Sequence, residues 1–232
     1  MLLERDYFVC QVSFPKLLIL EKEEPLAFHE KIRKTFMNYK KNEESSTEIN
    51  LNAENYGDNN KVVNRKYEFY NEDKQIHINL RSDSIALFCK NEISNEEFNG
   101  LLKNILEILW AIYEIPFSNR VGVRSTYYEK LELISESEGY GPPKKVSRNI
   151  LGFFPIEMEH KVAANRFIQE LVKDDQVTRV ITGLGYLNKE PAFVIDIDTF
   201  SLNEKKTIEE IIECKNQHTT NTDYILDLLV EG

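Results

Sequence analysis

The stretch "NRVGVRSTYYEKLEL" (residues 119–133) alternates in the way expected of a β-strand. Side chains two positions apart share one face of a strand, so Arg120, Gly122, Arg124 and Tyr128 are predicted to point the same way. Glycine weakens a strand and lets another group approach the backbone closely. The two guanidinium groups therefore either line an anion site or neutralise carboxylates on a neighbouring strand.

A second stretch, "VIDID" (residues 194–198), carries carboxylates at the same spacing. It places Asp196 and Asp198 on one face of another predicted strand. Cross-strand ion pairing of Arg120 and Arg124 with these two aspartates explains both motifs without a ligand. The alternative is a small anionic ligand such as a nucleotide, held through its phosphate by bidentate arginine hydrogen bonds, with Gly122 and Tyr128 completing that site.

The aspartate pair also suggests a third hypothesis, a divalent-metal hydrolase. Two aspartates on a strand can hold Mg²⁺, and the acids and His160 of "EMEH" (residues 157–160) would have to join Asp196 and Asp198. No histidine has a metal-binding spacing, and the sequence contains no nucleophile elbow. We therefore expect no catalytic residue, metal or cofactor, and the sequence favours a protein that is not an enzyme.

The apolar pattern predicts an α+β protein. A β-meander at 66–90 precedes a long helix that begins with the capping box of Ser94 and Glu97. Strands at 177–186 and 191–200 precede a helix at 204–230, with a break near Thr219 and Thr220. The order predicts an antiparallel, curved sheet in two similar β-β-α halves, with long helices packed on one face.

The predicted halves are residues 1–117 and 118–232, sharing one sheet and one core. A strand is expected at 7–14 and a helix from about residue 25 to 38. Residues 40–64 contain few apolar side chains and are predicted to form a mobile loop. A short helix is expected near 161–172.

Composition limits the function classes. The chain has 232 residues, 41% of them hydrophobic, which is enough for a sizeable core. Its net charge of -10 repels phosphate backbones and disfavours generic nucleic-acid binding. The N-terminus lacks a signal-peptide pattern, and no apolar run is long enough to span a membrane. Three widely spaced cysteines, Cys10, Cys89 and Cys214, are expected to be reduced and buried, so we expect a cytoplasmic protein.

The order of these motifs resembles a sporadically distributed, functionally uncharacterised prokaryotic family of about 250 residues. The matching pieces are "SFP" (13–15), Pro25, "EFYNEDKQIHINLRSDSIALF" (68–88), the helix from Phe98 to Tyr113, Arg120-Gly122-Arg124, "DID" (196–198), and His218 with Tyr224. The family has Y-x-N after the second arginine and Leu before the histidine. This chain instead has Ser125, Thr126 and Tyr127, and Gln217.

The resemblance implies an accessory gene, linked to phage defence or toxin–antitoxin loci, and brings no catalytic residue or cofactor. Together with the acidic composition and the lack of catalytic motifs, it favours a cytoplasmic binding or regulatory protein. Such a protein would act by docking a partner protein or a second copy of itself. The anion binder and the metal hydrolase remain the alternatives.

Overall fold

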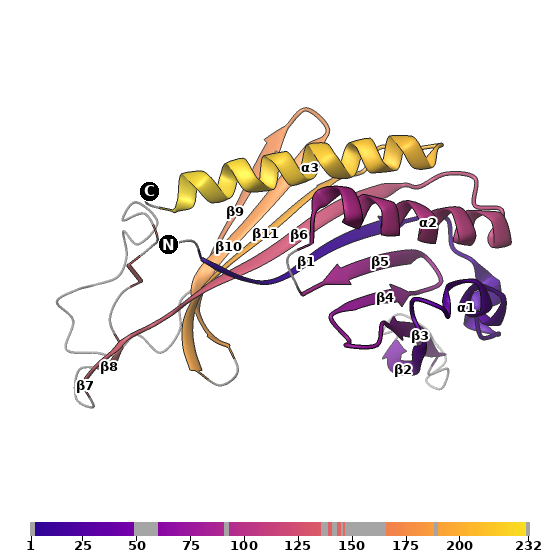
Figure 1. Cartoon of the computed structure of the whole chain (residues 1–232), viewed down its shortest axis with the longest axis horizontal. Helices are drawn as coiled ribbons and strands as arrows, with labels where there is room; N and C mark the ends of the chain where they lie inside the picture. The colour runs from indigo at the N-terminus through magenta and orange to yellow at the C-terminus, as the bar shows by residue number, and fades with distance from the viewer. Residues whose placement is uncertain are drawn as a thin grey trace, which may run out of the picture. The chain divides into compact units, whose positions relative to one another are not determined.

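The computed structural model describes residues 3–48, 60–90, 93–135, 139–140, 143–144, 146, 166–187 and 190–230. Within these ranges the chain forms a nine-stranded antiparallel sheet, a two-stranded ribbon and three α-helices (Figure 1). The predicted α+β class and the antiparallel sheet are confirmed. The similarity of two halves and the curvature of the sheet stay predictions.

The large sheet has the strand order β2-β3-β4-β5-β1-β6-β11-β10-β9. Its strands are β1 (Glu4–Ser13), β2 (Asn38–Glu48), β3 (Asn60–Tyr70), β4 (Ile76–Leu80), β5 (Ser84–Cys89), β6 (Arg120–Lys130), β9 (Arg166–Lys173), β10 (Gln176–Leu187) and β11 (Glu190–Ser201). The ribbon is made of β7 (Leu133–Ser135) and β8 (Gly139–Tyr140). The helices are the 3-10 turn η1 (Leu18–Glu21), α1 (Leu26–Ile32), α2 (Asn95–Tyr113) and α3 (Ile208–Leu229).

The chain divides into two compact units. Unit 1 contains Met1–Cys10, Arg120–Asn203 and Glu213–Gly232, and unit 2 contains Gln11–Asn119 and Glu204–Ile212. Unit 1 holds the arginine strand and the aspartate strand, so it carries the candidate site. None of the helices in the described ranges is long and apolar enough to cross a membrane.

In unit 2, α2 begins where the sequence predicts. The Ser94 hydroxyl accepts a hydrogen bond from the backbone N–H of Glu97 at 3.0 Å, which satisfies one free donor of the first turn. The helix buries an apolar face made of Phe98, Leu102, Ile105, Leu106 and Leu109. It ends at Glu114, which adopts a left-handed conformation with φ 50°.

A buried tyrosine ties the 3-10 turn of unit 2 to its sheet. The Tyr67 hydroxyl on β3 donates to the carbonyls of Leu20 and Glu23, at 2.9 and 3.0 Å. Its ring lies in a core that includes Phe69 and Ile78, all three with no exposed surface. The buried hydroxyl is thus fully engaged, which its location requires.

In unit 1, α3 covers one face of β10 and β11. Alternate residues of these strands point toward the helix and are buried with residues of its last turns. The strand residues in this core are Val180, Phe193, Ile195 and Ile197, and Ile225, Leu226 and Leu229 of α3 pack against them. The residues between them in sequence point to the opposite face, which we call the open face of unit 1.

The predicted loop at 40–64 is wrong over most of its length. Strand β2 reaches Glu48, β3 begins at Asn60, and residues 49–59 lie outside the described residues. The two strands are held by a continuous antiparallel register from Asn38↔Tyr70 to Glu48↔Asn60. Backbone pairing therefore orders a polar segment whose side chains alone predict a loop.

Three helix predictions need correction. The helix expected at 25–38 ends at Ile32, and β2 begins at Asn38. The C-terminal helix α3 is continuous from Ile208 to Leu229, with no break near Thr219. The helix expected at 161–172 is wrong from residue 166 onward, because Arg166–Lys173 form strand β9, which pairs with β10 along its whole length. Residues 161–165 lie outside the described residues.

Candidate functional site

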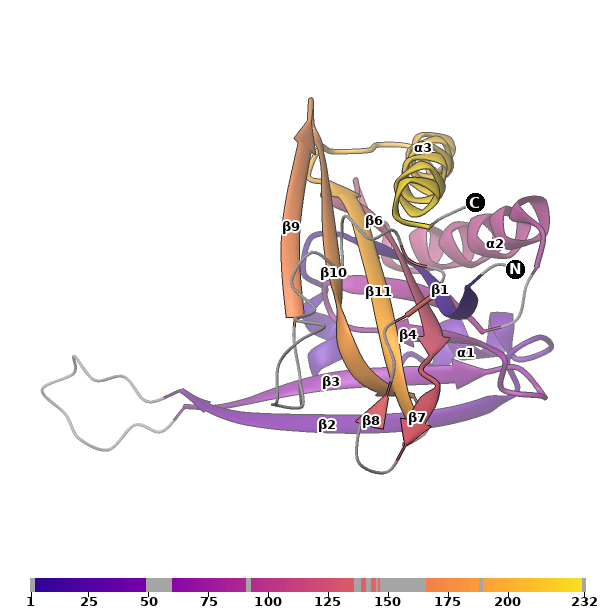
Figure 2. The same ribbon diagram turned by 90° about the vertical axis from the view of Figure 1, so that its left-hand side faces the viewer.

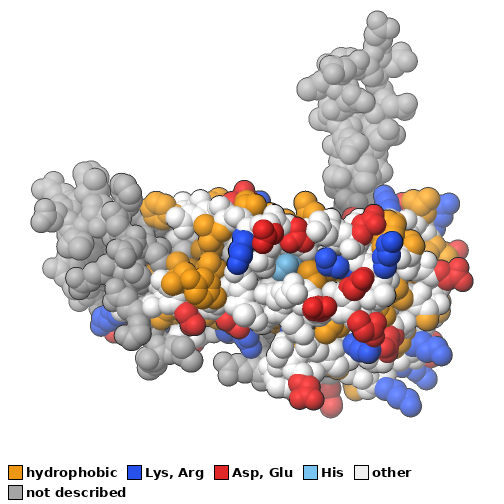
Figure 3. Space-filling view, turned by 90° about the horizontal axis from the view of Figure 1, so that it is seen from above, with side chains coloured by type: hydrophobic (Ala, Val, Ile, Leu, Met, Phe, Trp, Pro, Cys, Tyr) orange, Lys and Arg blue, Asp and Glu red, His pale blue; other side chains and the backbone are white. Residues whose placement is uncertain are grey.

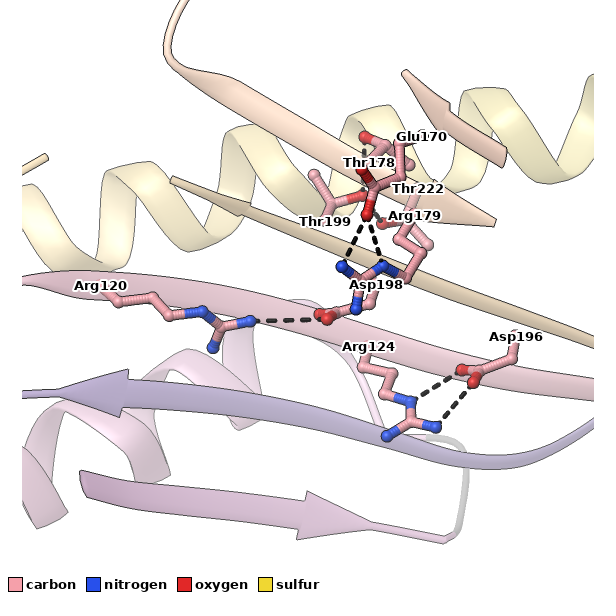
Figure 4. A network of polar contacts seen from close by, with 9 residues as sticks. All are labelled: Arg120, Arg124, Glu170, Thr178, Arg179, Asp196, Asp198, Thr199 and Thr222. Atoms are coloured by element: carbon pink, nitrogen blue, oxygen red, sulfur yellow. Dashed lines mark hydrogen bonds and ion pairs between the residues drawn. The ribbon is translucent and has the colours of Figure 1, made fainter. Parts of the chain in front are cut away.

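The two arginines of β6 face the two aspartates of β11 (Figure 4). Arg124 makes a bidentate pair with Asp196, with Nε 2.8 Å from Oδ1 and Nη2 2.6 Å from Oδ2. Nη2 of Arg120 lies 3.5 Å from Oδ2 of Asp198. Thr126 adds a hydroxyl donor to Asp196 Oδ1 at 3.2 Å. Each carboxylate of the "DID" motif therefore has an arginine of β6 beside it.

Gly122 makes room for an arginine of its own strand. A β-carbon at this position would lie 2.7 Å from Nη1 of Arg120 and 3.0 Å from its Cζ. The guanidinium group also lies over the ring of Phe200, 4.5 Å from the ring centroid, and Phe200 is opposite Gly122 in the β6–β11 register. The space above the glycine is thus filled by Arg120, which stacks there as a cation on an aromatic face.

Across strands β6, β11, β10 and β9, residues of opposite charge lie opposite one another and form a row of alternating charge. Arg124 is opposite Asp198 on β11, Asp198 is opposite Arg179 on β10, and Arg179 is opposite Glu170 on β9. Arg179 donates from Nε and Nη2 to one oxygen of Glu170, at 2.8 and 2.6 Å. We call these four residues the charge ladder. It runs across the open face of unit 1 and ends at the outer strand.

Burial and the neighbouring arginines act in opposite directions on the pKa of Asp198. Desolvation raises the pKa of this carboxyl above its ordinary value, while Arg120 and Arg124 pull the pKa down. The hydrogen bonds to Asp196 raise the pKa of Arg124, so this guanidinium stays charged at any physiological pH. Neither pair resembles a proton-transfer site at neutral pH.

Tyr128, the fourth residue of the hypothetical ligand site, has a different partner. Its hydroxyl donates to the carboxylate of Glu4 on β1, and this hydrogen bond raises the tyrosine pKa to about 12. The structure thus brings Arg120, Arg124 and the two aspartates together and engages Tyr128 with Glu4.

The residues of the hypothetical metal site are only partly within the described ranges. Glu157, Glu159 and His160 lie outside them. In the part of the chain that the structure describes, no group of three or more His, Cys, Asp or Glu side chains could hold a metal ion.

A buried polar cluster lies on the other face of unit 1, beneath α3. The amide nitrogen of Gln176 is 2.8 Å from Nδ1 of His218, and Nε2 of His218 is 3.3 Å from both Ser201 Oγ and Cys214 Sγ. Because the amide donates to Nδ1, the ring carries its proton on Nε2. In this tautomer Nε2 donates toward Ser201 Oγ. With His218 and Ser201 3% and 2% exposed, the cluster is a structural network.

A lysine is buried next to this cluster. Lys215 on α3 has no exposed surface, and its ammonium lies 5.3 Å from the centroid of the Phe8 ring. Burial lowers the lysine pKa to about 8, against the opposing influence of Cys10 and Asp223. The cation–π contact with Phe8 compensates part of the cost of burying this charge.

Strand β9 is a candidate binding feature that the sequence did not predict. It is the last strand in the sheet order, and no described strand pairs with its outer edge (Figure 2). All eight of its residues are exposed. Ile168 and Val172, on the open face, are 57% and 72% exposed, and Leu171 on the α3 side is 46% exposed. The strand mixes four apolar side chains with Arg166, Gln169, Glu170 and Lys173, and an outer strand edge of this kind can pair with another chain.

Exposed apolar residues also occur outside β9. On the face drawn in Figure 3, acidic and basic side chains are spread mostly over the middle and right, while hydrophobic side chains gather in a group toward the left. Tyr224 and Leu228 on α3, for example, are 59% and 58% exposed, and the acids Asp223 and Asp227 adjoin them in sequence. Because they are four residues apart, Tyr224 and Leu228 lie on the same face of the helix. In β9 the exposed apolar residues lie instead along the outer strand of the sheet.

No protein-family model matches the chain, and no curated protein matches it. The resemblance to a prokaryotic family stays a prediction. The open face of unit 1 and the edge of β9 are the features of the described chain that bear on function.

Proposed function

We propose that this is a non-enzymatic binding or regulatory protein that docks a partner protein by adding an extended strand to the edge of β9. The observation that supports this is the exposure of Ile168, Leu171 and Val172 along an outer strand. Strand addition at a sheet edge is a recurrent mode of peptide recognition, in which main-chain hydrogen bonds supply affinity and alternate side chains supply specificity.

The charge ladder defines the chemistry that fits this edge. Its terminal member, Glu170, lies between Ile168 and Val172 on the open face. An added strand would therefore carry apolar, basic and apolar side chains at alternate positions, so that its basic group continues the alternation after Glu170. Opposite charges directly across a strand pair stabilise it, and like charges destabilise it.

The geometry favours protein docking over the two alternatives. An anion held by Arg120 and Arg124 would compete with Asp198 and Asp196, which already lie beside the guanidinium groups. A divalent metal on the same aspartates would have to displace both arginines. Docking at β9 leaves these ion pairs intact.

The setting that we propose is cytoplasmic. All three cysteines are buried thiols that form no disulfide, which fits a reducing compartment. The family resemblance adds an accessory role, linked to phage defence or toxin–antitoxin loci, as part of the proposal.

A peptide-binding experiment tests the proposed function. A fluorescent peptide with Val, Lys and Val at alternate positions is titrated with the protein, and a twin with Glu in place of Lys is the matched control. We expect the basic peptide to bind at least tenfold more tightly, and Ile168→Lys to abolish its binding. Equal affinity for the two peptides, or binding unaffected by Ile168→Lys, would overturn docking at this edge.

A further inference from the structure

We propose that the partner at β9 is a second copy of this chain, joined by antiparallel β9–β9 pairing about a two-fold axis at Ile168. This inference rests on the proposed function, because it names the occupant of the same edge. Two-fold symmetry is the commonest arrangement of soluble oligomers, and it makes the same surface meet itself. The question is whether β9 is complementary to itself, and in which register.

The face alternation limits the registers. A two-fold axis perpendicular to the sheet keeps the open faces of both copies on the same side. It then pairs residues of the open face with one another: Arg166, Ile168, Glu170 and Val172. Open-face residues of the two copies pair with one another only when the axis passes through a single residue of β9. Only a few pairing registers meet this requirement.

Charge selects among them. In the register centred on Ile168, Arg166 of each copy lies opposite Glu170 of the other. In the register centred on Glu170, the two glutamates face each other, which is unfavourable. In the register centred on Gln169, Glu170 faces Ile168 and gains no basic partner. The register centred on Ile168 alone gives Glu170 a basic partner within the described strand.

This pairing continues the charge ladder across the junction. Within one copy the ladder alternates from Arg124 through Asp198 and Arg179 to Glu170. The next position needs a positive charge, and Arg166 of the second copy supplies it. Because the axis is two-fold, the same continuation occurs twice in one interface.

An apolar row forms at the axis itself. Ile168 is opposite Ile181 on β10 and is 57% exposed. Pairing about Ile168 places the two copies of this residue against each other, with Ile181 of each copy on the outer side. On the opposite face, Phe167 of each copy meets Gln169 of the other. Exposed apolar surface at the edge is thereby covered by an identical strand.

Thiol cross-linking tests the register. Ile168→Cys and Val172→Cys each add one exposed cysteine, while the three native cysteines are buried. Across the proposed axis the two positions 168 are about 5 Å apart between Cα atoms, whereas the two positions 172 are roughly 26 Å apart. A short bismaleimide should link Ile168→Cys at least tenfold faster than Val172→Cys, although Val172 is the more exposed residue. Equal rates, or faster linking of Val172→Cys, would overturn the proposal.

Charge exchange provides the second measurement. By sedimentation equilibrium we expect a dimer, weakened about tenfold in Arg166→Glu and in Glu170→Arg. An equimolar mixture of the two variants should recover the dimer, because each cross-strand pair is then of opposite charge. A mixture no tighter than the single variants contradicts the register.

The two proposals fail in different ways. A protein that remains monomeric at all concentrations but binds the basic peptide overturns self-pairing and leaves docking at β9 standing. A monomer that binds neither peptide overturns both.

Discussion

A β-carbon at Gly122 would lie 2.7 Å from Nη1 of Arg120, two residues earlier on the same strand. The glycine therefore provides the space in which an arginine folds back over its own strand and stacks on Phe200. From that position Arg120 also reaches Asp198. In the Arg-Val-Gly-Val-Arg motif, the glycine thus lets Arg120 lie over its own strand. Arg124 instead extends toward Asp196.

We expect Gly122→Ala to change the free energy of unfolding by less than about 0.5 kcal/mol, because the backbone gain of replacing a strand glycine is offset by the loss of the contact between Arg120 and Phe200. The added methyl group must displace the flexible end of Arg120 from Phe200. Gly100→Ala is the control, since a β-carbon there meets nothing within 4 Å in the helix α2. This control should raise the free energy of unfolding by about 0.5–1 kcal/mol. Urea denaturation measures both, and a Gly122→Ala protein as stable as Gly100→Ala would contradict the role of the glycine.

The pair of Arg124 and Asp196 should show a measurable coupling energy. The carboxylate side chain is 12% exposed, and the pair is bidentate. A double-mutant cycle with Arg124→Ala and Asp196→Ala is expected to give about 1 kcal/mol by urea denaturation.

The control pair for this cycle joins the same two strands. Lys130 lies 2.9 Å from Glu190, but the two side chains are 58% and 62% exposed. Its coupling should be close to zero, because solvent screens exposed ion pairs. Equal coupling in the two cycles is the result that contradicts a special role for the aspartate pair.

Replacing the buried lysine should change the pH dependence of stability. The pKa of Lys215 is lowered to about 8, so above pH 8 the folded protein releases this proton while the unfolded chain still holds it. Wild type should therefore gain stability relative to Lys215→Met as the pH rises from about 8 toward the ordinary lysine pKa near 10.5. At pH 7 the methionine variant should be at least as stable as wild type, because it removes a buried charge.

Comparing the two proteins at each pH gives the contribution of Lys215 together with its electrostatic interaction with Cys10. The pKa of Cys10 is raised to about 12, and that thiol has the opposite effect on wild type above pH 9. Chemical denaturation between pH 7 and 10 gives the difference. A difference in the free energy of unfolding that does not change with pH would falsify the lowered pKa of Lys215.

The cysteines should be unreactive in the folded protein. Cys10, Cys89 and Cys214 are 0%, 1% and 5% exposed, and burial raises the pKa of Cys10 to about 12. Ellman's reagent should react with all three thiols in denaturant and at least a hundredfold more slowly without it, since the thiolate is the reactive form. Rapid native labelling of any one of them would show that its part of the core opens readily.

Strong periodic patterns in the sequence led to correct elements. The strand that starts at Arg120 alternates, and the α2 helix has both a cap and a wide apolar face. The matched spacing in "RVGVR" and "DID" also suggested that the two motifs face each other, because cross-strand neighbours share a face. Each of these patterns can be read within a short segment, although the two motifs that face each other are far apart in sequence.

The β9 edge could not be predicted in this way. Phe167, Ile168, Leu171 and Val172 are spaced as on one side of a helix, and only the pairing with β10 makes the segment a strand. The side-chain path of Arg120 over Gly122 was equally hidden, because it depends on Phe200 across the sheet. In both cases the local structure depends on a contact with a neighbouring strand, β10 for the strand at 166–173 and β11 for the side chain of Arg120.

The pairing of β6 with β11 has a consequence for synthesis of the chain. Val121 on β6 lies opposite Ser201 on β11 in the antiparallel register, so β6 leaves the ribosome long before its neighbour β11 is translated. During that interval the nascent chain exposes an apolar strand whose edge is open. Folding of unit 1 therefore waits for nearly the whole polypeptide, and pairing between strands so far apart in sequence favours slow folding.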